Sequence, residues 1–156
     1  MSHEKDNLVV AFQGMPGAYS NMACEAYFPN AKTLPCNSFE DMLNSTKNAL
    51  SDFSMVPVEN SLAGRVADIH HLIPDSGLFI VGEHFQRVNH QLLGLENSNL
   101  ENIESVKSHA QGLAQCRKFI SDHNLSPIQH IDTAGAAEEI SRLGDPKVAA
   151  IASDMA

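Results

Sequence analysis

The stretch that decides the fold is Leu8-Val9-Val10-Ala11-Phe12, followed after one residue by Gly14-Met15-Pro16-Gly17-Ala18-Tyr19-Ser20. The first five residues are apolar and partly β-branched, which predicts a short buried strand. The two glycines allow a tight turn, and apolar side chains then recur at helical spacing from Ala18 to Phe28, where Pro29 ends the predicted helix. A strand, a turn and a helix in this order indicate the start of an α/β fold.

The same alternation continues along the rest of the chain. Short strands that alternate with helices favour an α/β architecture with largely parallel sheets. Further strands are predicted at residues 32–35, 53–58, 105–108, 127–131 and 148–151, and further helices from Ser38 onward and at residues 66–73, 113–120 and 136–143.

The longest strand-like stretch, residues 78–95, is predicted to form two strands joined at a kink near Gly82–Arg87. We expect the chain to leave one lobe and begin another at this kink. The expected organisation is a polar, frayed N-terminus at residues 1–7, a first lobe at 8–84 and a second lobe at 85–156. Ligands of open α/β sheets bind beyond the carboxyl ends of the strands, so the turns that follow the strands are the places to look for chemistry.

Composition excludes several classes of protein. The 156 residues carry a formal net charge of −9 and only ten lysines and arginines, which argues against nucleic acid as a partner. Three cysteines, at Cys24, Cys36 and Cys116, match no zinc spacing, so neither disulfides nor a structural metal are expected. No apolar run approaches the ~18 residues of a membrane span, and the expected compartment is the cytosol.

Two candidate binding turns lie in the first lobe. The turn at Gly17 and Ala18 precedes a helix, whose free N–H groups could hold a carboxylate or phosphate, although a plain strand-to-helix turn explains the same spacing. Asn60 and Ser61 follow the third strand, where an uncharged carboxamide suits a carboxylate or hydroxyl ligand. The alternative for Asn60 is a side chain that closes a turn on its own backbone.

The second lobe offers a further set of polar residues. Ser108 and His109 could be a nucleophile and its base, but neighbours on a strand point to opposite faces and no acid completes a triad, so hydrolysis is not favoured. The helix that follows carries Gln115. Asp132 and Thr133 either face a ligand or simply cap the next helix. A histidine at a strand end, His90, is either a proton carrier or satisfied by the backbone.

Taken in order, these turns resemble the prephenate dehydratase family from about Val9 to Ala152. Five segments in the family's order and spacing form a more specific signal than any one of them. The segments are Gly14–Ser20, Pro57–Ser61 with Gly64, Asn89-His90 with Leu92-Leu93, Ser108–Gln111 with Gln115-Cys116, and Asp132–Ala137.

This resemblance implies a two-lobed fold like the type II periplasmic binding proteins, with the active site in the cleft between the lobes. It implies a cofactor-free, decarboxylating dehydration of prephenate to phenylpyruvate in phenylalanine biosynthesis. Loss of carbon dioxide and hydroxyl makes the ring aromatic, and positioned donors can do most of the catalysis. By motif, the residues that would line the cleft are Asn60, Ser61, Ser108, Gln115, Asp132 and Thr133, with backbone donors near Gly17 and Ala18.

Two departures from the family pattern affect these expectations. Ala110 stands where the family usually has proline, so a looser turn is expected there. The family's Thr-Arg-Phe motif, whose threonine is the favoured acid, and its phenylalanine-sensing ACT domain are both absent from these 156 residues, which end at a predicted helix start, residues 153–156. The catalytic group is therefore unassigned, and a module that binds prephenate or another small carboxylate without turnover is the alternative. An incomplete first lobe should expose apolar surface and favour a homodimer.

Overall fold

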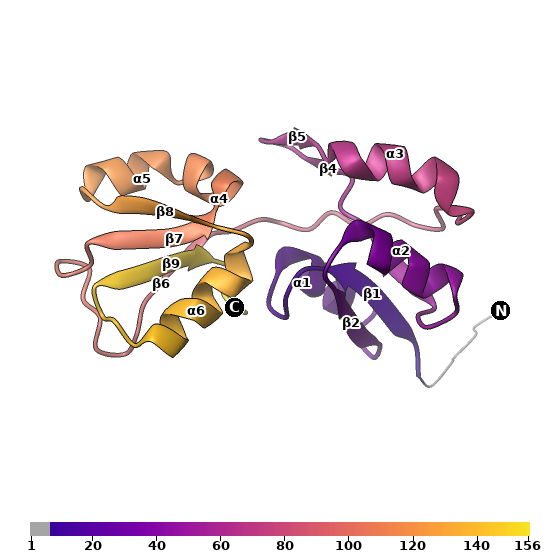
Figure 1. Ribbon diagram of the computed structural model, residues 1–156, viewed down its shortest axis with the longest axis horizontal. Helices are drawn as coiled ribbons and strands as arrows, with labels where there is room; N and C mark the ends of the chain where they lie inside the picture. Colours follow the sequence, from indigo (N-terminus) through magenta and orange to yellow (C-terminus); the bar gives the residue numbers. More distant parts are fainter. Residues whose placement is uncertain (1–6) are drawn as a thin grey trace. The chain divides into compact units, whose positions relative to one another are not determined.

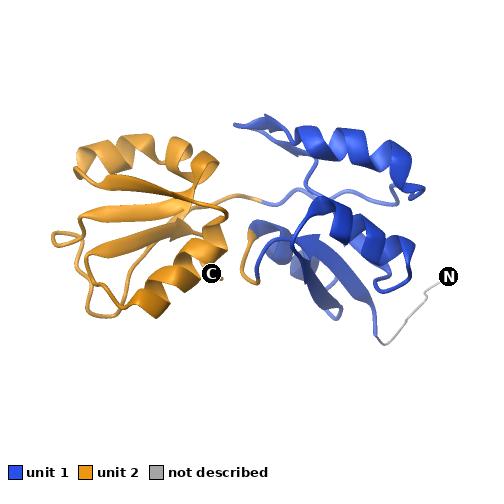
Figure 2. Ribbon diagram, viewed as in Figure 1, with its two compact units in different colours: residues 1–15, 19–86 blue, residues 16–18, 87–156 orange. Residues whose placement is uncertain are grey.

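The computed structural model describes residues 7–156, so all but the last residue of the N-terminal segment predicted to fray lies outside the described part. The chain divides into two compact α/β units, which are described separately below. The first comprises the residues up to Met15 together with Tyr19–Gln86, and the second comprises Pro16–Ala18 and Arg87–Ala156 (Figure 2). Within the described residues, no helix has the length and apolar character needed to cross a membrane.

The first unit is built on a three-stranded parallel sheet in the order β2-β1-β3. Successive side chains of the central strand point to opposite faces, and helices cover both (Figure 1). Val10 and Phe12 pack with Cys24 of α1, whereas Ala11 packs with Met42 of α2 on the other face. The bounds are β1 Val9–Gln13, α1 Tyr19–Tyr27, β2 Lys32–Cys36, α2 Phe39–Lys47 and β3 Phe53–Met55.

The helix predicted over residues 66–73 extends further than expected, because α3 spans Ala67–Ser76 and contains Pro74, a residue that usually ends a helix. Fully buried Ile69 anchors this helix in the core beside α2, and that packing outweighs the backbone hydrogen bond that proline cannot make. The helix ends at Gly77, which adopts the left-handed conformation that glycine tolerates. A small antiparallel hairpin, β4 Glu59–Asn60 and β5 Gly64–Arg65, precedes the helix and was not anticipated.

The prediction of two kinked strands over residues 78–95 is wrong. Only β6, Gln91–Leu93, is a strand, and residues 78–90 carry no regular structure. Strand preference mostly reflects packing against neighbouring strands. In the described part of the chain the run Phe79–Val81 has no such neighbour, and Phe79 is 90% exposed.

The second unit is built on a four-stranded sheet in the order β6-β9-β7-β8, in which only β6 runs antiparallel. One face packs Val106 and Ile151 against Ile120 of α5, and the other packs alanines of β9 against Ile140 of α6 (Figure 1). The bounds are β7 Ser105–His109, α4 Ala110–Gln115, α5 Arg117–Asp122, β8 Ser126–His130, α6 Thr133–Leu143 and β9 Val148–Ala152.

Two predicted helices of this unit need correction. The single helix expected over residues 113–120 is two short ones that meet at Cys116, which is the C-cap of α4 and the N-cap of α5. Residues 153–156, predicted to begin a helix, form a turn in which the Ala156 N–H donates to the Ser153 carbonyl.

Candidate functional site

The polar residues of the second unit gather where its three parallel strands end. Ser108 is the second-to-last residue of β7, Asp132 follows β8, and Ser153 follows β9. Because β7, β8 and β9 are parallel, their carboxyl ends share one edge of the sheet. Two helices, α4 and α6, begin at this edge, so backbone N–H groups and polar side chains meet there.

Ser108 is fully buried, and its hydroxyl donates to the Ile151 carbonyl at 2.6 Å. It therefore ties β7 to β9. Gly112 of α4 covers it so closely that an added Cβ would lie 2.7 Å from the Ser108 Oγ. A carboxylate can only accept hydrogen bonds, so binding one through Ser108 would require this hydroxyl to release Ile151. Its predicted role in binding stays a prediction.

His109 acts as the N-cap of α4 and accepts a hydrogen bond at Nδ1 from the Gln111 N–H at 3.2 Å. This bond uses the nitrogen that a general base would need, in agreement with the prediction that Ser108 and His109 are not a nucleophile pair. The helix begins at Ala110, the first helical position, where a proline would also fit without losing a hydrogen bond. The departure from the family pattern at Ala110 therefore leaves the helix start in place.

Gln115 is the last residue of α4, and its carboxamide oxygen lies 2.8 Å from the Nε2 atom of His90. Both side chains are half-buried. His90 directly precedes β6, so the pair joins two segments of the unit that are 25 residues apart. Neither motif by itself indicates this pairing, and sequence reasoning missed it.

Asp132 caps α6, because its Oδ1 accepts from the Gly135 N–H at 2.6 Å. Of the two roles considered for Asp132, helix capping is the one seen in the structure. Thr133 is the first residue of α6 and is half-buried. In the described part of the chain its hydroxyl makes no hydrogen bond, which leaves it available to a ligand.

The turn at Gly17 belongs to the second unit by its contacts. Gly17 has φ +85°, and the Ser153 hydroxyl donates to its carbonyl. An added Cβ on Gly17 would lie 2.8 Å from Ala156 Cα, so the last residues of the chain pack directly on this glycine. Ala18 beside it is half-buried. Ser153 is itself fully buried, and only its position after a strand of small residues could have identified it as a partner of the turn.

Asn60 and Ser61 lie in the hairpin of the first unit. The Asn60 Oδ1 accepts from the N–H groups of Leu62 at 2.9 Å and Ala63 at 3.0 Å, which is the turn-closing alternative. The carboxamide nitrogen of Asn60 keeps two donors without a partner among residues 7–156, and Ser61 is exposed. That Asn60 and Ser61 bind the substrate stays a prediction.

A salt bridge between Lys107 and Glu139 lies on β7 and α6, and the His130 ring lies close to the same carboxylate. Lys107 Nζ lies 3.0 Å and His130 Nε2 lies 3.6 Å from Glu139 Oε2. The hydrogen bond from Lys107 is the main cause that holds the pKa of Glu139 below its ordinary value. Among the described residues, no group of three or more His, Cys, Asp or Glu side chains is arranged to hold a metal ion.

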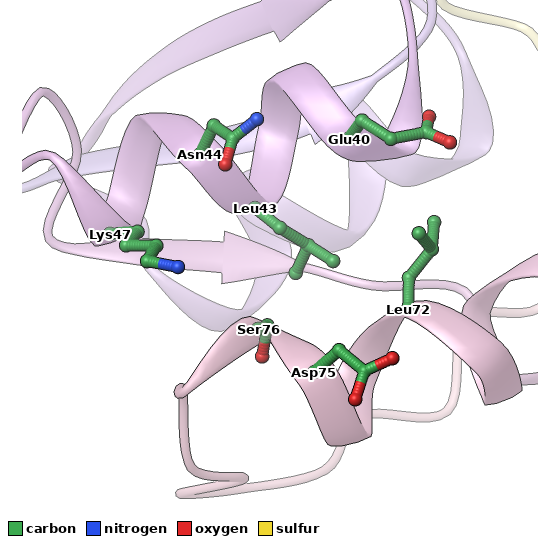
Figure 3. Close-up of a pocket in the computed structure, with 7 residues that line it drawn as sticks. All are labelled: Glu40, Leu43, Asn44, Lys47, Leu72, Asp75 and Ser76. Carbon is green, nitrogen blue, oxygen red and sulfur yellow. The ribbon is translucent and has the colours of Figure 1, made fainter.

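Two surface hollows lie apart from these residues. One, of about 140 Å³, sits between α2 and α3 and is lined by Leu43 and Leu72 together with charged side chains of both signs (Figure 3). The other, of about 310 Å³, lies in the second unit beside Glu104 and Lys147. None of the predicted site residues lines either hollow, and the first is smaller than a typical ligand pocket.

The largely parallel sheets, with polar turns at the carboxyl ends of their strands, place this chain among the α/β proteins. A sequence model of the prephenate dehydratase family matches residues 10–156. The chain belongs to the prephenate dehydratase family.

Known relatives are similar over most of this chain. A bifunctional N-acyl-homoserine lactone acylase/prephenate dehydratase of Komagataeibacter europaeus is 46% identical over 95% of this chain and 53% of its own length. Arogenate dehydratase/prephenate dehydratase 1 of Arabidopsis thaliana is 40% identical over 92% of this chain and 37% of its own. The solved structure of GqqA, described as a novel type of quorum quenching acylase, has a TM-score of 0.88 at 46% identity and covers 94% of this chain and 54% of that one. The chain therefore spans about half the length of the bacterial relative and less than half the length of the plant relative.

Proposed function

We propose that this protein acts as a prephenate dehydratase, which removes water and carbon dioxide from prephenate to give phenylpyruvate. The observation that carries the proposal is the family match over residues 10–156. The reaction needs two carboxylates to be recognised and one of them to leave. Uncharged donors such as Gln115, Thr133 and Asn60 suit this task, because they orient a carboxylate without binding it so tightly that decarboxylation is suppressed.

The proposal includes the setting of the reaction. It places the protein in the cytosol, uses no metal or cofactor, and takes prephenate as the partner, with no nucleic acid or membrane. The finer fold assignment, a two-lobed arrangement of the type II periplasmic binding proteins with lobes at residues 8–84 and 85–156, is part of the same proposal. The residue that protonates the departing hydroxyl remains unassigned, so binding of prephenate or another small carboxylate without turnover is the alternative.

The test is to incubate the protein with prephenate and follow phenylpyruvate by its absorbance, with calorimetric titration in parallel. Turnover above the uncatalysed rate supports the dehydratase, and tight binding without turnover supports the binding module. Gln115→Ala should weaken binding by about tenfold, the value of one lost hydrogen bond to a charged group. Gln129→Ala, an exposed glutamine of β8, is the matched control and should change nothing. A protein that neither binds nor converts prephenate contradicts both functions.

The second candidate function is acyl-amide hydrolysis, favoured by the 46% identity to a relative named as an acylase. The geometry at Ser108 offers little support, because this buried hydroxyl donates to a backbone carbonyl and His109 is engaged as a helix cap. Release of the free acid from an N-acyl-homoserine lactone, lost in Ser108→Ala, would establish the second function.

We also propose that the protein forms a homodimer through the segment Phe79–Phe85. Phe79 and Phe85 are 90% and 87% exposed, and Ile80 and Val81 are about three-quarters exposed. The two phenylalanines alone offer roughly 350 Å² per copy. With their neighbours, two paired copies would bury on the order of 1,200 Å², the lower limit for a stable interface. The segment has no strand partner among the described residues, so an antiparallel pairing with a second copy would satisfy its backbone as well.

Light scattering tests this dimer. The double variant Phe79→Ser, Phe85→Ser should shift the protein from dimer to monomer. Leu62→Ser, which alters a side chain that is 79% exposed in the β4–β5 turn, should leave the dimer intact. A wild-type protein that is monomeric at high concentration, or a dimer that survives the double change, refutes this interface.

A further inference from the structure

The pairing of His90 with Gln115 determines how the Gln115 carboxamide can be oriented. The Nε2 atom of His90 lies 2.8 Å from the Gln115 Oε1. With the carboxamide oxygen toward the ring, as it is placed here, Nε2 carries the proton, because a carbonyl oxygen can only accept a hydrogen bond. The histidine ring is then the donor, and the carboxamide oxygen is turned toward it.

This orientation matters because a carboxamide has two unlike ends. Its oxygen accepts hydrogen bonds and its nitrogen donates two. When the oxygen is bound to His90, both N–H groups face away from the ring and can reach an anion. Without a partner the group can turn by half a circle, and in that orientation its oxygen would repel a carboxylate.

The ring is held against the same helix that carries Gln115. A Cβ added to Gly112 of α4 would lie 3.6 Å from the His90 Cε1 atom and 2.7 Å from the Ser108 Oγ. The imidazole therefore lies beside Gly112, at a distance where an alanine side chain at this position would just touch the ring. The neighbouring Ser108 is fully buried, and its hydroxyl is fixed by the hydrogen bond to the Ile151 carbonyl. The residues around the ring are therefore well ordered by packing.

We infer that His90 is a positioning residue, which donates from Nε2 to the Gln115 oxygen and so presents the two Gln115 N–H groups to a carboxylate of the ligand. The inference rests on the proposed function for the identity of the ligand. It assigns His90 no proton transfer to or from the substrate, and it distinguishes this histidine from His109, which caps a helix.

A double-mutant cycle tests the coupling. The variants are His90→Ala, Gln115→Ala and their combination, and the readout is the Kd for phenylpyruvate and prephenate by calorimetry. Each single change should weaken binding by about tenfold. The combined variant should bind no more weakly than Gln115→Ala alone, because His90 acts only through Gln115. His90→Gln can place an amide N–H near the position of Nε2 and should recover most of the affinity, whereas independent, multiplicative losses in the cycle would overturn the inference.

A second measurement separates this inference from the proposed function. In protein labelled with nitrogen-15, the ring signals of His90 should show a proton on Nε2, and the side-chain amide signals of Gln115 should move in His90→Ala. If the wild type binds neither acid, the proposed function fails, and the inference is judged on these signals alone. An unprotonated Nε2, or Gln115 amide signals unchanged by His90→Ala, would overturn it.

Discussion

Replacing Gly112 by alanine should destabilise the second unit through Ser108. The new Cβ would lie 2.7 Å from the Ser108 Oγ, well inside any normal contact, and the displaced hydroxyl would lose its 2.6 Å hydrogen bond to the Ile151 carbonyl. The lost buried bond costs about 1–3 kcal/mol and the overpacking a similar amount. Alanine returns up to ~1 kcal/mol of helix propensity. We expect a net loss of about 2–4 kcal/mol.

The double variant gives the sharper test, because removing the hydroxyl removes the clash. Ser108→Ala alone should cost about 1–3 kcal/mol, since the Ile151 carbonyl loses its donor. In the double variant Ser108→Ala, Gly112→Ala the added methyl group fills the vacated space. Its next neighbours, the His90 Cε1 and the Cβ of residue 108, both lie at an acceptable 3.6 Å. The double variant should therefore be no less stable than Ser108→Ala, a coupling of at least about 2 kcal/mol.

Calorimetric or circular-dichroism melting curves measure these differences, at about 4–8 °C per kcal/mol for a domain of this size. Gly144→Ala is the matched control. Its φ is +69° and no atom lies within 4 Å of the added Cβ, so it should cost about 1 kcal/mol and add independently to Ser108→Ala. A Gly112→Ala protein as stable as wild type, or losses that simply add in the double variant, would refute the packing argument.

Three further predictions concern groups outside this contact. Burial raises the pKa of Cys24 to about 12, so in native protein at pH 8 this thiol should react with a disulfide reagent on the order of 10³-fold more slowly than a free thiol, and at the normal rate in urea. The pKa of Glu139 is lowered mainly by the Lys107 hydrogen bond, so its contribution to stability is present above the ordinary carboxyl pKa and lost as pH falls through the lowered one. Lys107→Met should lower the melting temperature at pH 7 and flatten its decline between about pH 5 and 3; an unchanged pH profile would contradict this. Gly17→Ala meets backbone atoms of Met155 and Ala156 at 2.8 Å with φ +85°, and should speed proteolysis near the end of the chain.

Local sequence patterns predicted most of the regular structure, because the relevant forces are local. The apolar run at residues 8–12 lies mostly in β1, Val9–Gln13, and the helix predicted from Ser38 onward is α2, which Ser38 caps by accepting from the Asp41 N–H at 3.1 Å. The failures occurred where distant packing decides the outcome. Pro74 is tolerated because Ile69, five residues earlier, is fully buried, and the run Phe79–Val81 is no strand because residues 7–156 offer it no neighbouring strand.

In the candidate site, too, the local interactions could be predicted and the contacts between distant residues could not. A sequence can indicate that Asp132 caps a helix and that Asn60 closes a turn, and both do so. It cannot decide whether the remaining donors also serve a ligand. Spacing cannot reveal that a histidine at one strand end meets a glutamine 25 residues later. That contact depends on the fold of the unit, which brings the start of β6 beside the end of α4. If the Gln115 carboxamide is held in one orientation, a few uncharged groups suffice to recognise an anion in a protein with a net charge of −9. Donors that already point at the anion need no reorganisation on binding, and this preorganisation replaces the attraction that a positive charge would provide.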